Sequence, residues 1–166
     1  MTLTPPVLKR TLVRFTTKVS TPNMQRVLDA QRGPCDVVFQ PGEYTLTQRL
    51  RFPRDCAVYA PDASILLPQT GRSTGHVVGR DCVFEGGDWL SEHTPIEGQP
   101  WLPTDGAVFT LGQYYGHAPD AGTPHHVRFR DLTVRTNSAG PALNDAGTRC
   151  GGYCLFVTGG CQDIYV

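Results

Sequence analysis

The chain has 166 residues, of which 39% are hydrophobic and 18% are charged, which is enough to build the core of one domain. Its 15 basic and 15 acidic residues cancel, which argues against nucleic acid as the main partner. No stretch approaches the roughly 20 apolar residues of a membrane-spanning helix, and residues 1–20 lack the apolar core of a secretory signal. The sequence therefore predicts no membrane segment and no signal peptide.

We interpret residues 1–20 as a basic N-terminal arm in front of a single domain over residues 21–166. Five basic residues precede the first acid, Asp29, which leaves 10 basic and 15 acidic residues for the remainder. The candidate assembly residues of the arm are Lys9, Arg10, Arg14 and Lys18. A basic arm on an acidic body could dock on a neighbouring copy of the chain, and an ordinary polar tail is the alternative. Within it, residues 12–15 could add to a sheet as an edge strand.

A short helix is predicted over residues 21–30. Thr21 is a plausible N-cap and Pro22 suits the first helical position. The residues expected on one apolar face are Met24, Val27 and Leu28. Because such a helix directly precedes the first predicted strand, we expect it to cover an apolar end of the strand domain.

A short pattern then recurs, in which a polar residue is followed by a strand with two inward apolar positions. Its copies begin at Asp36, Asp55, Asp81, His126 and Asp163. Counted on the first apolar residue, the copies are 19, 26, 45 and 37 residues apart. Gly-Pro corners separate further short strands between the copies. A strand that returns at irregular intervals is typical of a solenoid with insertions, here of about four coils.

The segment from Asp36 to Leu46, DVVFQPGEYTL, resembles the opening turn of the pectin-lyase-like superfamily, which commonly follows a capping helix. The resemblance extends over residues 21–166. It implies an all-β fold, a right-handed parallel β-helix with a short N-terminal capping helix. The superfamily includes polysaccharide lyases, glycoside hydrolases, phage tailspikes and non-catalytic virion proteins, so the resemblance does not choose an activity.

Three acids are weak candidates for a catalytic carboxylate pair of the kind that cleaves glycosidic bonds: Glu85, Asp88 and Asp105. His93 lies close to them in the sequence. The competing interpretation is structural, because Glu85 and Asp88 flank the corner Gly86-Gly87. The acids that begin each copy of the pattern are likewise expected to accept turn amides rather than to bind calcium.

The histidines and cysteines do not predict a metal site, and no cofactor is predicted. Cys56 and Cys82 occupy equivalent positions of the pattern, so we expect buried thiols there. The spacing of Cys150, Cys154 and Cys161 does not match a zinc site, and a local disulfide is the alternative outside a cell. His126 is expected to act as a turn residue.

Candidate ligand-binding aromatic residues lie on two long predicted loops, residues 92–106 and 112–124. They are Trp101, Tyr114 and Tyr115. Sugars stack on flat aromatic faces, and loops on a rigid scaffold commonly carry binding sites. Packing of the loops themselves, or a contact between subunits, is the alternative.

The chain stops at Val166, inside a predicted strand. We expect another copy, most simply in a trimer, or a larger assembly to cover that edge. The alternatives are that the chain is part of a longer protein and that the terminal strand is frayed. The favoured function is a non-catalytic structural or attachment module, such as a phage decoration, head-fibre or tail subunit. Its expected location is a virion or an extracellular surface. The alternative is the N-terminal part of a polysaccharide lyase or glycoside hydrolase that acts on acidic or capsular polysaccharide.

Overall fold

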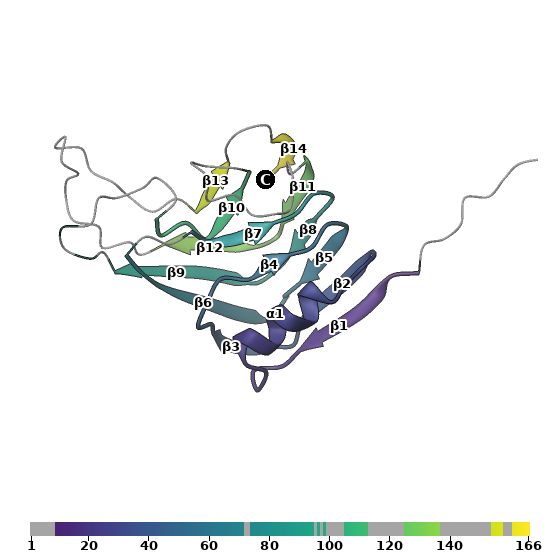
Figure 1. Cartoon of the computed structure of the whole chain (residues 1–166), viewed down its shortest axis with the longest axis horizontal. Coiled ribbons are helices and arrows are strands. Elements are labelled where there is room, and N and C mark those ends of the chain that lie inside the picture. Colours follow the sequence, from purple (N-terminus) through teal and green to yellow (C-terminus); the bar gives the residue numbers. More distant parts are fainter. Residues whose placement is uncertain are drawn as a thin grey trace, which may run out of the picture.

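The structure is a computed structural model, and its strands stack in layers along one axis of the molecule (Figure 1). The residues that it describes are 9–71, 74–94, 96, 98, 105–112, 125–136, 154–157 and 161–166. Within these ranges the chain forms mainly strands, together with one short helix, α1 (Thr21–Asp29). No helix in the described part is long and apolar enough to span a membrane.

The strands form three sheets, which we name A, B and C. Sheet A contains, in order, β1 (Thr11–Phe15), β2 (Cys35–Phe39), β5 (Cys56–Tyr59), β8 (Val83–Glu85), β11 (His125–Arg130) and β14 (Gln162–Tyr165). Sheet B contains β3 (Gly42–Thr45), β6 (Ala63–Thr70), β9 (Asp88–Thr94) and β12 (Thr133–Thr136). Sheet C contains β4 (Arg51–Phe52), β7 (His76–Val78), β10 (Phe109–Leu111) and β13 (Leu155–Val157). All pairings among these strands are parallel, which confirms the prediction of a strand-rich chain with parallel pairing.

The register of sheet A corrects the first copy of the sequence pattern. Cys35 pairs with Cys56, so Asp36 lies opposite Ala57 and not in the same column as Asp55. The first two copies are therefore 21 residues apart, from Cys35 to Cys56, instead of 19. A shift of two residues leaves the inward and outward alternation unchanged, so the apolar pattern alone could not distinguish the two registers.

Four residues at or just before the start of strands of sheet A adopt a left-handed backbone conformation. Asp55, Asp81, His126 and Asp163 have φ values of 56°, 55°, 53° and 51°. Aspartate tolerates this conformation better than most residues because its short polar side chain bonds to nearby backbone groups. Asp55 and Asp81 precede β5 and β8, whereas His126 and Asp163 are the second residues of β11 and β14. Their backbone fits the predicted turn role, and acceptance of turn amides by their side chains stays a prediction. Asp36, the second residue of β2, does not have a positive φ.

The interior is filled with aromatic side chains from all three sheets. Trp89 lies at its centre, with ring centroids 5.1 Å from Phe109, 5.7 Å from Phe39 and 6.1 Å from Phe84. The Phe84 ring also stacks on Phe129 at 5.2 Å, which continues the aromatic contact into the next layer. Close packing of this kind fixes the relative positions of the layers.

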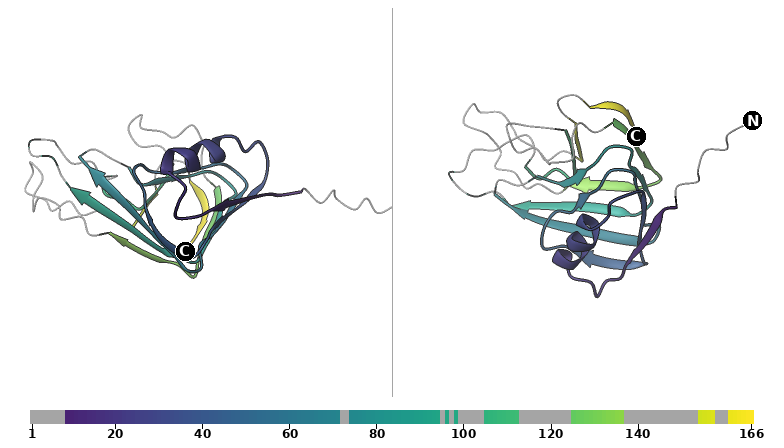
Figure 2. Two further views of the ribbon diagram at one scale, coloured as in Figure 1. Left: turned by 90° about the horizontal axis from the view of Figure 1, so that it is seen from below. Right: turned by 45° about the vertical axis from the view of Figure 1, so that its right-hand side comes forward.

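Helix α1 lies against β4 at the end of the molecule where β1 and β3 lie (Figures 1 and 2). Met24 and Leu28 are buried as predicted, but Val27 is 36% exposed. The other two buried residues of the helix are polar, Thr21 and Gln25. The N-cap is Ser20 and not Thr21, because the Thr21 hydroxyl instead accepts a hydrogen bond from the Thr47 amide. The helix covers the end of the core, as the sequence predicted.

Strand β1 confirms the predicted edge strand over residues 12–15. It pairs in parallel with β2, beginning with Thr11 opposite Cys35. Val13 and Phe15 point into the core, and the other three residues of the strand are exposed. Part of the proposed arm thus belongs to sheet A.

Candidate functional site

The candidate catalytic acids lie in two different places. Glu85 ends β8 and Asp88 begins β9, on either side of the corner formed by Gly86 and Gly87, whose φ values are 75° and 90°. Asp105 instead lies in the segment before β10, and its side chain is buried. Only Glu85 and Asp88 therefore share a corner, as the structural interpretation of these two acids required.

The carboxylate of Asp88 is occupied by an arginine of the neighbouring strand. Arg135 on β12 donates from Nε to Oδ1 of Asp88 at 3.0 Å, and its terminal nitrogen contacts Oδ2. Two parallel contacts of this kind form the planar fork by which a guanidinium binds a carboxylate. Asp88 therefore connects β9 to β12 across the outer face of sheet B.

A buried polar cluster lies where β6 and β9 end, and we call it the polar end of sheet B: Gln69, Ser91 and His93. Gln69 lies opposite His93 in the register, and its amide donates to the Ser91 hydroxyl at 2.6 Å and to the Ala107 carbonyl at 2.8 Å. Nε2 of His93 lies 2.7 Å from the Gly71 carbonyl oxygen. The bond to Ala107 holds the segment before β10 onto sheet B, and the other two connect the ends of β6 and β9.

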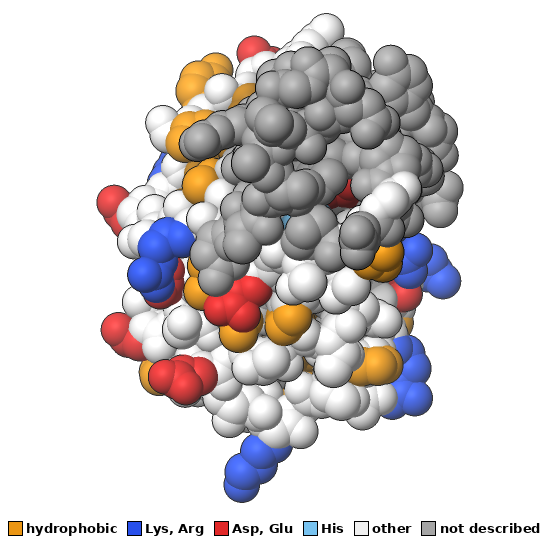
Figure 3. All heavy atoms as spheres, turned by 90° about the vertical axis from the view of Figure 1, so that its left-hand side faces the viewer, with side chains coloured by type: hydrophobic (Ala, Val, Ile, Leu, Met, Phe, Trp, Pro, Cys, Tyr) orange, Lys and Arg blue, Asp and Glu red, His pale blue; other side chains and the backbone are white. Residues whose placement is uncertain are grey.

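Sequence reasoning had named His93 and Asp105 but had missed Gln69 and Ser91. Along β6 the inward positions are Ala63, Ile65, Leu67 and Gln69, so the inward alternation continues after the apolar residues end. That continued alternation could have predicted from the sequence that Gln69 points inward. Figure 3 views the molecule from the side on which β6 and β9 end, and charged side chains of both signs are scattered over the described part of this face.

A second polar cluster lies at the outer corners of sheet A, and we call it the corner ladder: Asp81, His126 and Asp163. Nδ1 of His126 lies 3.1 Å from Oδ1 of Asp81, and Nε2 lies 3.2 Å from Oδ2 of Asp163. Only the protonated imidazole donates at both nitrogens, so this geometry suits an imidazolium between two carboxylates. Among the described residues, no three His, Cys, Asp or Glu side chains are arranged to hold a metal ion.

The corner ladder yields a prediction for His126→Asn, a change that keeps a residue able to adopt positive φ. In buffer of low ionic strength we expect the free energy of unfolding to fall by about 0.5–1 kcal/mol, as for other exposed ion pairs. Urea unfolding monitored by circular dichroism measures the difference. Because salt screens exposed charges, the loss should shrink in concentrated sodium chloride. An equal loss at high salt would assign the effect to the backbone and not to the two ion pairs.

The basic residues of the proposed arm differ in what they contact. Arg10 forms an ion pair with Asp36 at 2.6 Å and donates to the carbonyl oxygens of Cys35 at 2.6 Å and Asp55 at 3.1 Å. The Arg10 guanidinium is thus paired within the chain, at the edge of sheet A. The three remaining candidates are exposed: Lys9, Arg14 and Lys18.

The stacked cysteines are buried, as predicted for Cys56 and Cys82, and Cys35 extends their column. Burial raises the pKa of Cys82 to about 12, and the hydrogen bond with Cys35, together with burial, raises the pKa of Cys56. These two thiols therefore stay protonated and pack as small apolar groups. Cys150 lies outside the described residues.

The predicted aromatic ligand-binding residues cannot be placed, because Trp101, Tyr114 and Tyr115 lie outside the described residues. Stacking of sugars on them stays a prediction. No family model, curated protein or solved structure matches the chain. The pectin-lyase-like resemblance therefore also stays a prediction, and function is argued from the geometry above.

Proposed function

We propose that the chain is a right-handed parallel β-helix module with a non-catalytic structural or attachment role on a virion. The observation that carries the proposal is the bidentate contact between Asp88 and Arg135. Through this contact Asp88, one of the three candidate catalytic acids, joins β9 to β12. Other outer acids also form contacts within the chain: Asp81 and Asp163 in the corner ladder, and Asp36 on β2 with Arg10.

The strand order supports the β-helix path. From β2 onward, every third strand returns to the same sheet, so β2, β5 and β8 are neighbours in sheet A. The same interval applies in sheets B and C. Connections between parallel strands of one sheet are right-handed in about 98% of cases, which supports a right-handed coil.

Exposed apolar side chains on the last strands support association with further copies. Tyr165 on β14 is 56% exposed and Val157 on β13 is 44% exposed. Each of these strands has one described neighbour, and an unpaired strand edge is a template for pairing with another chain. We propose a homo-oligomer, with a trimer favoured, or a larger particle.

The molar mass in solution tests this proposal, measured by light scattering and combined with depolymerisation assays on acidic and capsular polysaccharides. We expect a discrete multiple of 18.2 kDa, most simply three copies, and no depolymerisation. Two results together would overturn the proposal. The chain would be a stable monomer of 18.2 kDa that cleaves a polysaccharide, and Asp88→Asn or Glu85→Gln would abolish the cleavage without loss of stability.

The alternative, part of a polysaccharide lyase or glycoside hydrolase, is favoured by one observation. His93 is buried at the polar end of sheet B, and Asp105 is buried two residues before Ala107, whose carbonyl Gln69 binds. Burial of ionisable groups is one of the ways in which active sites are built. Asp105→Asn belongs in the same assays. Loss of a measured activity with an unchanged melting temperature would favour the enzyme over the structural module.

A further inference from the structure

A cavity of about 280 Å³ opens beside α1, and four long polar side chains line it. They are Gln25, Gln48, Arg49 and Arg51. Its volume is close to the lower bound, about 300 Å³, of ordinary small-molecule sites. The lining is therefore polar and cationic, and the space suits a small ligand or one sugar residue.

The turn that carries Gln48 and Arg49 is held at both ends by the helix. Thr21 accepts the amide of Thr47 at 3.0 Å. Gln25, one helical turn later, accepts the amide of Arg51 at 2.8 Å and donates to its carbonyl at 3.3 Å. Since both ends of the turn are fixed, ordering of its backbone adds little cost to binding of a ligand.

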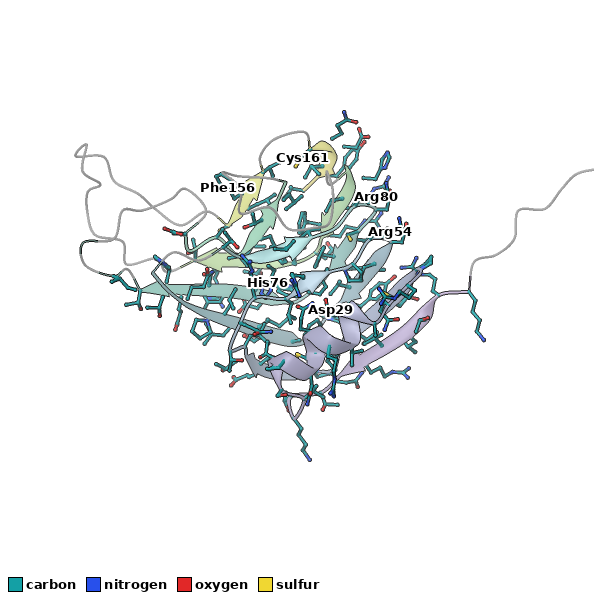
Figure 4. The ribbon with its side chains drawn as sticks, viewed as in Figure 1. Asp29, Arg54, His76, Arg80, Phe156 and Cys161 are labelled. Atoms are coloured by element: carbon teal, nitrogen blue, oxygen red, sulfur yellow. The ribbon has the colours of Figure 1, made fainter. Side chains whose placement is uncertain are left out.

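The charges of the cavity do not balance. Arg51 forms an ion pair with Asp29 at 3.4 Å, and Figure 4 shows Asp29 near the end of α1. Within the described part of the chain, no carboxylate lies within 4 Å of the Arg49 guanidinium. Arg49 and Arg51 are both exposed to solvent at the mouth of the cavity. Partial desolvation, and then the neighbouring charge of Arg51, lower the pKa of Arg49. Two cations therefore share one acid.

We propose that this cavity is an oxyanion-binding site in which Arg49 and Arg51 together hold a phosphate, sulfate or carboxylate group. Guanidinium groups bind such anions through paired, charge-assisted hydrogen bonds. An anion between Arg49 and Arg51 also offsets the repulsion between the two cations. The anion comes either from a free inorganic ion or from the carboxylate of an acidic sugar, and the site does not depend on the structural role proposed above.

Isothermal titration calorimetry on the full chain tests the site with three probes at constant ionic strength: sodium sulfate, sodium phosphate and trigalacturonate. We expect saturable binding with one anion per chain, and Arg49→Gln should weaken it by about tenfold or more, as loss of a charge-assisted hydrogen bond does. Tighter binding of trigalacturonate would identify an acidic sugar as the source. Binding of the inorganic anions alone would identify a free ion.

Arg14→Gln is the matched control, because it removes the same charge from an exposed position on β1 that does not line the cavity. It should change the affinity by less than about twofold, since a distant surface charge is screened. Arg49→Lys keeps the charge without the planar fork and should bind with intermediate affinity. The proposal is overturned if no probe binds saturably to the wild-type chain, or if Arg14→Gln weakens binding as much as Arg49→Gln does.

Discussion

Trp89→Ala is expected to lower the free energy of unfolding by about 3–5 kcal/mol, the range for loss of a large buried aromatic side chain. Trp89 joins the three sheets, since its ring lies 5.7 Å from Phe39, 6.3 Å from Phe52 and 5.1 Å from Phe109. Its indole NH also donates to the Gly86 carbonyl at 3.1 Å, next to the corner between β8 and β9. Truncation would leave a cavity that the surrounding strands can fill only by moving together.

Urea unfolding followed by far-UV circular dichroism measures this loss. Trp89→Phe keeps most of the ring volume and loses the hydrogen bond, so it should cost clearly less than Trp89→Ala. Tyr59→Ala removes an exposed aromatic side chain from β5 and should change stability by less than about 0.5 kcal/mol. A loss below about 1.5 kcal/mol for Trp89→Ala would mean that the interior repacks around the gap, contrary to the layered packing described here.

Local alternation was sufficient to predict the strands but not their register. The apolar residues of β2 and β5 specify which face is buried, and that part of the prediction is confirmed. Asp36 and Asp55 each precede a short apolar run, so the sequence pattern assigned both to the same position of the repeat. The structure separates them because Cys35, not Val37, pairs with Cys56. Registers that differ by two residues bury the same face, and only contacts between strands decide between them.

Polar residues were harder to assign, because their partners are distant in sequence. Gln69 is 38 residues from Ala107, whose carbonyl it binds, and Arg10 is 26 residues from Asp36. Neither pair follows from spacing along one strand or helix. Nothing in the sequence of the predicted helix distinguished Gln25, yet it accepts the Arg51 amide and so fixes one end of the turn beside the cavity. Corner acids were predictable because the demand for positive φ is local.

The pH dependence of stability should show the burial of His76. Its ring lies in the interior between the sheets (Figure 4), in contact with Trp89 and Phe109, and Nδ1 accepts the Leu50 amide at 3.0 Å. Burial lowers the pKa of His76 to about 3. The unfolded chain binds a proton there near the ordinary value of about 6.5, whereas the folded chain does not, so acid favours unfolding. This residue alone should lower the free energy of unfolding by about 2 kcal/mol between pH 7 and pH 5.

His76→Asn isolates that contribution, because the asparagine Oδ1 can take the place of Nδ1 as acceptor for Leu50 while the side chain does not titrate. Urea unfolding from pH 7 to pH 5 should show a difference between wild type and variant that narrows by about 2 kcal/mol as the pH falls. The stabilising effect of the neutral ring is complete above pH 6.5 and is lost on acidification toward pH 3. Parallel pH profiles for the two proteins would show that His76 accepts a proton in the folded state, which its position between Trp89 and Phe109 opposes.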